Sequence, residues 1–362
     1  MSAYLDALAE KYAAIFVAAF DGIDETLWTK PWLCGGIAPQ QNLSGTVYNG
    51  TNRFATLANV SKNGYRTNIW GTFLQWKELG ITIRRGEQSV PVCKFDFYVK
   101  DTVNNRRSQV TVDEYRQMSA AEREEKGLEL RRDIYNFSVF NADQTNLSEV
   151  YPDAYESLVR ASVAADHSVD LASVDSLISR STGWICPVAV VEGREPSYHR
   201  GLGVVYTPGK EAYKTNRDFY ATLFRSLAHS TGAKGALDRA SLGETSLEGV
   251  AREELTCEFA SALCCNRVGL DATLARDNVQ YLKIWTEKIG RDPKVIYSIL
   301  KDAVKASDMI LSAIGLGREE GIDVRPSLGM DVKAIEAKRQ ESREEKTRRR
   351  RVSKMARGVK HS

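Results

Sequence analysis

The stretch that decides the fold is residues 64–95, GYRTNIWGTFLQWKELGITIRRGEQSVPVCKF. Aromatic faces stack on the bases of single strands, and Lys and Arg neutralise phosphates, so aromatics interleaved with cations are typical of a surface for single-stranded nucleic acid. On spacing alone, the three-residue step of Trp70, Phe73 and Trp76 favours one buried helical face, and composition does not decide. Between residues 48 and 100 the chain places Tyr65, Trp70, Phe73 and Trp76 among the cations Arg53, Lys62, Arg66, Lys77, Arg84 and Arg85.

The segments around this stretch predict a mixed unit of strands and helices over residues 1–147. Residues 90–100, VPVCKFDFYVK, alternate strictly and predict a half-buried strand. Residues 131–141 repeat the alternation, and the charged segment 111–127 between them predicts an exposed helix. Residues 54–65 predict a further helix that ends near Gly64. The apolar face of the expected strand consists of Cys93, Phe95, Phe97 and Val99.

A second unit follows after a polar, mixed stretch from about Leu147 to Arg180, which predicts a connector and a helix. Short apolar runs at residues 184–193 and 201–207 predict strands. From Arg217 onward the pattern is helical, with glycines at the helix ends, so we expect a small sheet followed by a helical bundle. The expected divisions are a domain over 1–147, a connector over 148–180, a second domain over 181–321 and a tail over 322–362.

The composition is that of an ordinary globular protein, because 43% of the 362 residues are hydrophobic and 27% are charged. It excludes collagen, a coiled-coil rod and a wholly disordered chain, and the length predicts two domains that each bury a core. No run approaches the roughly 20 apolar residues of a membrane span. The six cysteines form no CxxC pair and no disulfide-dense spacing. We therefore expect reduced thiols, a cytoplasmic location and no membrane partner.

The basic character is concentrated at the C-terminus. Eight Lys and Arg residues follow Glu345 with no acid among them, which leaves −5 for the rest of a chain whose total charge is +3. Such a tail either contacts nucleic acid or is simply solvated. It cannot bury enough apolar surface to fold alone, so we expect residues 322–362 to be disordered.

Several motifs in order resemble the N-terminal domain of ArdC-type antirestriction proteins: PW at 31–32, VYNGTN at 47–52, the stretch 64–95 and VFNADQT at 139–145. The resemblance covers most of residues 1–147. It implies a domain that binds single-stranded DNA, in a family carried by plasmids, phages and conjugative elements. The motif positions of the family fall on Tyr48, Asn52, Trp70, Phe73, Trp76, Gly80, Arg84, Gly86 and Glu87. With the neighbouring cations, the DNA-binding residues we expect are Tyr48, Asn52, Arg53, Trp70, Phe73, Trp76, Arg84 and Arg85.

The second domain of that family resembles a zincin-type metallopeptidase with an HExxH helix. Two His residues at i and i+4 can both reach Zn²⁺, and the Glu polarises the bound water. Residues 219–232, FYATLFRSLAHSTG, are similar to that helix, but Arg225 and Ser226 stand where the first His and the Glu belong. The next helix supplies an acidic segment similar to the one that offers a further ligand. The resemblance implies a vestigial metal set of His229, Glu254 and Glu258.

Arg225 cannot be a metal ligand, because its guanidinium stays protonated. Without one ligand and the general base there is little basis for water activation, so we expect no catalytic residues and no cofactor, with zinc disfavoured. A cation exchanged for a cation opposite an unchanged acid predicts a structural pair between Arg225 and Glu254. The alternative is that Arg225 points into solvent. A nucleophilic arrangement of Ser226 and His229 with an Asp has no supporting spacing.

The sequence therefore predicts an α+β protein of two domains, a mixed α/β single-stranded-DNA-binding domain and a degenerate, mostly helical zincin-like domain. We expect it to protect the DNA of a mobile element against restriction by stoichiometric binding. Two alternatives stay open. One is a zinc-dependent peptidase with a rearranged site, and the other is a protein that holds a peptide or protein partner in a peptidase-like groove without cutting it.

Overall fold

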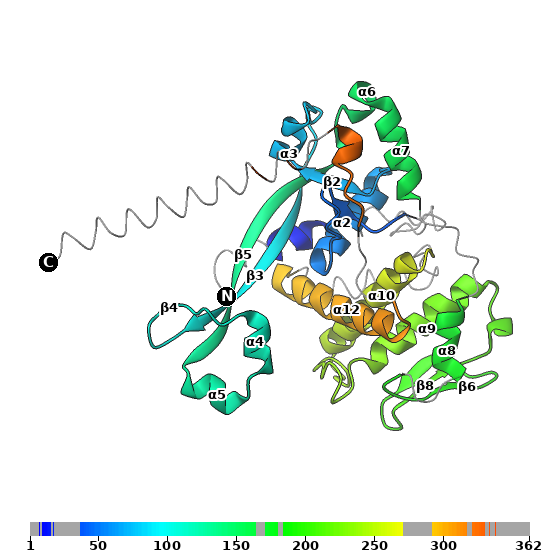
Figure 1. The fold of residues 1–362 in the computed structure, drawn as a ribbon. Helices are drawn as coiled ribbons and strands as arrows, with labels where there is room; N and C mark the ends of the chain where they lie inside the picture. Colours follow the sequence, from blue (N-terminus) through cyan, green and yellow to red (C-terminus); the bar gives the residue numbers. More distant parts are fainter. Residues whose placement is uncertain are drawn as a thin grey trace.

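The computed structural model describes residues 7, 9–15, 17, 37–163, 171–179, 184–270, 292–316, 321–329, 333 and 337. Within these ranges the chain forms a five-stranded sheet and a three-stranded sheet, both accompanied by helices (Figure 1). The predicted α+β fold class is confirmed. No helix in the described part of the chain is long and apolar enough to cross a bilayer.

A long antiparallel hairpin organises the five-stranded sheet. It consists of β3 (Val90–Asp101) and β5 (Leu128–Asn141), which pair along the whole length of β3. β2 (Ile69–Thr72) pairs antiparallel to the other edge of β5, and β1 (Gln41–Asn42) lies parallel to β2. β4 (Arg106–Arg107) completes the order β1-β2-β5-β3-β4.

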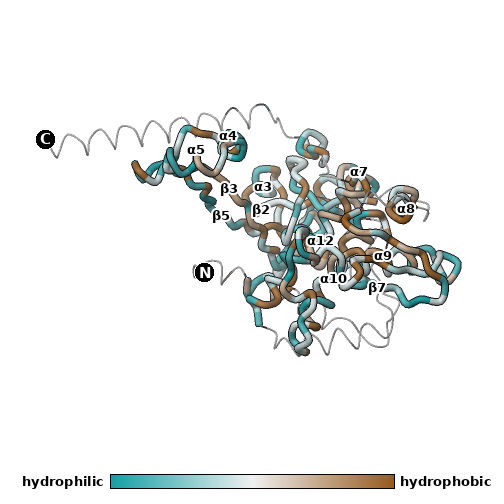
Figure 2. Tube along the Cα trace, turned by 90° about the horizontal axis from the view of Figure 1, so that it is seen from below, coloured by the Kyte–Doolittle hydropathy of each residue, from teal (hydrophilic) through white to brown (hydrophobic). Residues whose placement is uncertain are grey.

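The far half of the hairpin extends from the body as an arm. Its tip carries α4 (Val112–Gln117) and α5 (Ala120–Glu125), and Figures 1 and 2 both show this tip clear of the helical body. The sequence predicted one helix here. The chain forms two because Met118 is extended and Ser119 begins a new helix with its own capping box.

The arm alters the burial expected for β3. Cys93 and Val99 are buried as predicted, but Phe95 and Phe97 on the same face are 36% and 44% exposed. The strand prediction is confirmed, whereas the expectation of a fully covered apolar face is wrong. The reason is that the middle of the hairpin reaches beyond the elements that bury its two ends.

The stretch 64–95 contains a strand that turns directly into a helix. Thr72 ends β2 and caps α3 (Phe73–Glu78) through a capping box. Trp70 on the strand and Trp76 on the helix are both fully buried, and each indole N–H donates to an acceptor within 3.1 Å. Phe73, the first helical residue, is 55% exposed. The change of element thus separates three aromatics that a single helix would have placed together.

The second unit is a small sheet followed by helices, as the sequence predicted. Its strands have the order β6-β8-β7, parallel between β6 and β8 and antiparallel between β7 and β8. In chain order the elements are α8 (Ala172–Ser179), β6 (Val188–Val190), β7 (Ser197–His199), β8 (Val204–Thr207), α9 (Asn216–Ser230), α10 (Leu247–Arg267) and α12 (Pro293–Ala313).

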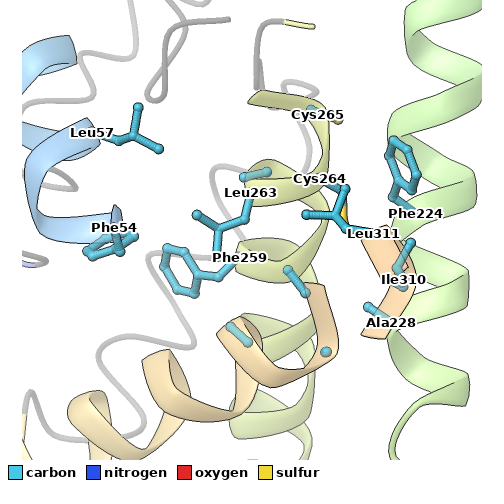
Figure 3. Packing of buried hydrophobic residues seen from close by; sticks show 14 of the residues in the cluster. Phe54, Leu57, Phe224, Ala228, Phe259, Leu263, Cys264, Cys265, Ile310 and Leu311 are labelled. Carbon is cyan, nitrogen blue, oxygen red and sulfur yellow. The ribbon is translucent and has the colours of Figure 1, made fainter. Parts of the chain in front are cut away.

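One hydrophobic core joins the two units (Figure 3). α2 (Thr51–Asn63) places Phe54 against Phe259 of α10, with ring centroids 5.6 Å apart and an interplanar angle of 86°. Phe224 and Ile310 of α9 and α12 continue the same cluster. The expectation that each domain buries its own core therefore holds only in part, because α2 packs across the boundary.

A second, smaller core lies within the first unit. α7 (Pro152–Ser162) follows the short helix α6 (Leu147–Val150) and buries Tyr155 and Leu158 against the cluster that contains Trp76. Both helices belong to the range that the sequence assigned to a connector. The helix expected in this stretch is present, and α7 is ordered because it buries an apolar face in the smaller core.

Residues 321–329, assigned by composition to the tail or to its border, return to the first unit. Gln41 donates to the carbonyl of Ile322 at 2.6 Å and accepts from its N–H at 3.0 Å. Val324 and Leu328 are buried in the smaller core. The expectation of disorder from the charged composition is therefore wrong for residues 322–329, because these apolar side chains are buried. The eight terminal cations, the PW motif and the helix expected over 272–290 lie outside the described residues.

Candidate functional site

A groove of about 1040 Å³ opens between α3, the loop before α2 and the half of the β3–β5 hairpin that lies nearer the body. Its walls carry exposed phenylalanines, namely Phe73 of α3, Phe95 of β3 and Phe137 of β5. The groove is open at β5 because β2 ends at Thr72, opposite Val139. Beyond this point β5 continues without a partner on that side among the described strands.

Three residues predicted to contact DNA line this groove: Tyr48, Asn52 and Phe73. Tyr48 is buried, and burial raises the pKa of its hydroxyl. Asn52 bridges two elements, because its amide donates to the carbonyl of Cys93 at 2.7 Å and accepts from the N–H of Cys93 at 2.9 Å. Phe73 is therefore the member of the three whose side chain a ligand can reach most readily.

The other predicted contacts are distributed elsewhere. Trp70 and Trp76 are fully buried, so Phe73 is the exposed member of the three aromatics and the one to which the expected stacking applies. Arg53 donates to the carbonyl of Leu263 at 2.8 Å, which ties α2 to α10. Arg84 donates to the carbonyl of Asp143 at 3.0 Å, and Arg85 is exposed to solvent.

The sequence analysis missed Phe137 and Asn136 of β5 as groove residues. The alternation of residues 131–141 was visible, and it marked Phe137 as an inward side chain of a strand. Only the early end of β2 leaves this part of β5 uncovered. A signal that could have found these residues is the difference in length between β2, which has four residues, and β5, which has fourteen.

In the second unit, Arg225 of α9 lies against the acidic face of α10. Its Nη2 donates to Oε2 of Glu254, and its Nε lies 3.3 Å from Oε2 of Glu258. The side chains are largely enclosed, with 31% of Arg225, 22% of Glu254 and 12% of Glu258 exposed. Two helices are thus joined by a guanidinium at the position where the resemblance implies a metal ligand.

His229 lies one turn further along α9 and also faces α10. Its Nδ1 is 3.3 Å from Oε1 of Glu253, and its Nε2 is 3.7 Å from Oε2 of Glu254. Glu253 is held in addition by Arg239, whose Nη2 donates at 2.6 Å, and by the Ser241 hydroxyl, also at 2.6 Å. Neither Glu253 nor Arg239 was predicted to belong to this site. Glu253 and Glu254 are adjacent in the sequence, but the sequence does not show which of the two glutamates faces which cation.

These neighbours set the protonation of the cluster. Burial would lower the pKa of His229, but Cys257 and the carboxylates of Glu253 and Glu254 outweigh it and hold that pKa well above 6.5. Burial would raise the pKa of Glu253, yet hydrogen bonds from His229 and Arg239 hold it well below its ordinary value. With His229 protonated, the cations Arg225, His229 and Arg239 face three carboxyl groups.

A metal ion needs ligand atoms that are close together and free to bind it. Those of His229, Glu253 and Cys257 lie within 4.8 Å of one another, which satisfies the first requirement. The second is not satisfied, because Arg239 donates to both Glu253 and Cys257. In the metal set that the resemblance implies, His229, Glu254 and Glu258, both carboxyl groups are already in contact with Arg225. A divalent cation does not fit among these side chains as they stand, since it would have to displace an arginine.

The residue at the position of the peptidase glutamate cannot act as a base. Ser226 is buried, and its hydroxyl donates back to the carbonyl of Thr222 at 3.1 Å within α9. The helix therefore carries an arginine and a serine at the positions where the resemblance places the first His and the Glu.

Comparisons with known proteins agree with this two-part arrangement. Residues 7–140 match the family described as the N-terminal domain of anti-restriction factor ArdC, and residues 177–302 match the zincin-like metallopeptidase family. These matches define a two-domain protein in which a zincin-like metallopeptidase domain follows an ArdC-type N-terminal domain. The resemblance to ArdC-type proteins that the sequence motifs indicated is confirmed by these two matches.

The chain is also similar to individual proteins. It is 25% identical to the uncharacterized protein y4eC of Sinorhizobium fredii, over 77% of this chain and 83% of that protein. It is 25% identical to the DNA primase TraC of Escherichia coli over 79% of this chain, which spans 25% of the primase. The metal-free crystal structure of the antirestriction protein ArdC from plasmid R388 shares the fold, with a TM-score of 0.58 at 21% identity, over 85% of this chain and 99% of that one. A Mn(II)-bound structure of the same protein aligns with a TM-score of 0.55 at 22% identity over 84% and 97%. The fold can therefore accommodate a divalent ion in that relative.

Proposed function

We propose that this protein binds single-stranded DNA through its N-terminal unit and protects the DNA of a mobile element against restriction. The observation that carries the proposal is the set of exposed aromatic side chains around the groove and along the arm. They are between 36% and 55% exposed, which is unusual for large aromatics that are free to pack inside. Listed in chain order, they are Phe73, Phe95, Phe97, Tyr135 and Phe137.

Cations lie among these aromatics. Lys94 stands opposite Tyr135 in the hairpin register, and the guanidinium of Arg132 lies 5.4 Å from the ring centroid of Phe95. Stacking contributes roughly 1–3 kcal/mol per base, and phosphate contacts add a salt-dependent attraction. The matched ArdC-type family and the similarity to a plasmid antirestriction protein and to a DNA primase support a role with DNA.

We further propose that the zincin-like domain does not hydrolyse peptides and holds no zinc. The observations behind this are the arginine at the metal position and the serine at the position of the base. The protein would then act by stoichiometric binding. A zinc-dependent peptidase with a rearranged site would require Arg225 to leave both carboxylates.

The test of DNA binding is fluorescence anisotropy of a labelled single-stranded oligonucleotide with duplex DNA as competitor, at several salt concentrations. The protein should be compared with a version truncated after Gly329, because this cut removes the basic tail and keeps Val324 and Leu328 in their core. We expect the truncated protein to bind and to prefer single strands. Binding that disappears with the tail would contradict the proposal and would favour a peptidase-like domain that holds a protein partner.

The test of the cellular role is plasmid transfer into a restricting host and into an otherwise identical host without the restriction enzyme. Expression of the protein should raise transfer into the restricting host alone. A variant with Arg225 and Glu254 exchanged for Met and Gln should act as well as the wild-type chain if it folds, because the proposal gives this pair no chemical task. Loss of protection in a folded variant would contradict the non-enzymatic part.

A further inference from the structure

The groove beside α3 is lined by aromatic rings on which a nucleobase can stack. Phe73 projects from the first turn of α3, and Phe95 and Phe137 line the groove from opposite faces of the hairpin, since Phe95 pairs with Ile134 and Phe137 with Val92. All three rings are exposed although they lie close to a core that could have buried them. Flat apolar side chains held open in this way suit stacking with unpaired bases.

The floor of the groove offers hydrogen-bonding groups for base edges. Asn136 is exposed, and its side-chain amide supplies both a donor and an acceptor. Main-chain groups of β5 near Phe137 and Ser138 are also available on this side, because β2 ends opposite Val139 and no other described strand continues it. A base in a duplex has its Watson–Crick edge occupied, so groups of this kind favour unpaired bases.

The charge of the groove indicates where the phosphates of a bound strand would lie. Its lining contains one cation, Lys94, and one anion, Glu78, so the interior carries no excess positive charge. Phosphates need cations around them, whereas bases are neutral. The exposed Lys77 of α3 lies beside Glu78 at the border. This distribution suits bases inside the groove and the sugar-phosphate chain outside it.

We propose that the groove between α3, the loop before α2 and β5 is a nucleobase site, which takes unpaired bases of single-stranded DNA on the ring of Phe73 and contacts their edges through Asn136. This inference rests on the proposed function, and it adds that the bases, more than the phosphates, provide the recognition. The arm beyond the groove then contributes secondary stacking.

The proposal is tested with two labelled oligonucleotides of equal length and charge, about 12 nucleotides long, which lies within the site sizes of roughly 4–16 for such domains. One is oligothymidylate, and the other has abasic sugars throughout. The full-length chain should bind the oligothymidylate more tightly. Phe73→Ala should weaken that binding by roughly 5- to 150-fold, which is the stacking contribution of one base, and leave binding of the abasic oligonucleotide unchanged.

Two controls make the result specific to the groove. Leu202→Ala removes an exposed apolar side chain, 66% exposed, from the second unit and should change nothing. Phe97→Ala removes an exposed phenylalanine from the arm outside the groove and should have a smaller effect than Phe73→Ala. Phe73 is more than half exposed, so its replacement should leave the fold intact, and circular dichroism checks this.

A second variant tests the contacts with base edges. Asn136→Leu keeps the approximate size of the side chain and removes both hydrogen-bonding groups. It should change the affinities for oligomers of dA, dC and dT by unequal factors, which a merely structural role would not do. Equal factors would overturn the assignment of Asn136.

The outcomes separate this proposal from the function on which it rests. If the wild-type chain prefers bases but Phe73→Ala has no effect, the groove assignment is overturned and DNA binding stands. If the wild-type chain binds both oligonucleotides equally, recognition is by phosphates and the nucleobase site is overturned. If it binds neither, both the proposed function and the groove assignment fail.

Discussion

Replacing Arg225 by alanine should destabilise the second unit clearly, because the guanidinium joins α9 to α10. Its removal leaves Glu254 and Glu258, 22% and 12% exposed, without their shared cation. Breaking a buried ion pair costs about 3–5 kcal/mol. Since Arg225 is itself 31% exposed and water screens part of the interaction, we expect the lower end, about 3 kcal/mol.

This free energy corresponds to a measurable change in melting temperature. A unit of roughly 150–250 residues shifts its Tm by about 2–4 °C per kcal/mol, so we expect Tm to fall by about 6–12 °C. The assay is differential scanning calorimetry, supported by urea unfolding monitored by circular dichroism. Arg217→Ala on the same helix is the matched control, because Arg217 is 37% exposed and lies 3.7 Å from Asp218 in the same turn. We expect the control to stay within about 0.5 kcal/mol of the wild type.

A double-mutant cycle identifies the partner. Arg225→Ala combined with Glu254→Gln should cost less than the sum of the single variants, because contacting residues couple by roughly 0.5–3 kcal/mol. If Arg225→Ala were as stable as Arg217→Ala, Arg225 would be a solvated side chain. The view that it replaces a metal ion as the link between the helices would then be refuted.

Three further predictions concern other parts of the molecule. Arg225→His removes the guanidinium and places a second imidazole one turn before His229. The variant should therefore bind stoichiometric Zn²⁺ in isothermal titration calorimetry, whereas the wild type should bind none. Equal uptake of Zn²⁺ by both would contradict the reasoning. The pKa of His229 is raised in the folded state, so its stabilising contribution is complete below about pH 6.5 and is lost as pH rises through the folded value. The Tm difference between wild type and His229→Gln should therefore be largest near pH 6 and shrink toward pH 9, and a difference that stays constant over this range would contradict the reasoning. Leu328→Ala should lower the free energy of unfolding by about 2–5 kcal/mol, as for other buried leucines, and a value near zero in urea unfolding would mean that residues 321–329 do not belong to the core.

Local patterns in the sequence were sufficient for most elements of the first unit. The alternation of residues 90–100 and 131–141 predicted β3 and β5, since a period of two places side chains on opposite faces of a strand whatever surrounds it. Gly64 marked the end of α2, where it adopts a left-handed conformation with φ of 67°. The absence of the first His and the Glu of an HExxH motif could also be determined from the sequence, because it depends only on which residues stand at positions 225 and 226.

Exposure depended on tertiary structure. Trp70, Phe73 and Trp76 are indistinguishable by composition and step, yet two are buried and one opens on the groove. The difference arises because a strand becomes a helix at Thr72, which resets the direction of each later side chain. Phe95 and Phe97 became exposed for another reason, since β3 and β5 are longer than the strands beside them.

The sequence by itself determined the ArdC-type order of motifs, the α+β class and the absence of the HExxH groups, because each is a property of residue types at fixed spacing. The pair of Arg225 and Glu254 was predicted from the residue types and is present, whereas the tertiary structure alone decided that Arg225 also meets Glu258, that His229 turns to Glu253, and that β5 leaves an open groove. These contacts join segments distant along the chain. Their geometry depends on how α10 packs against α9 and on where β2 ends, and no local spacing encodes either.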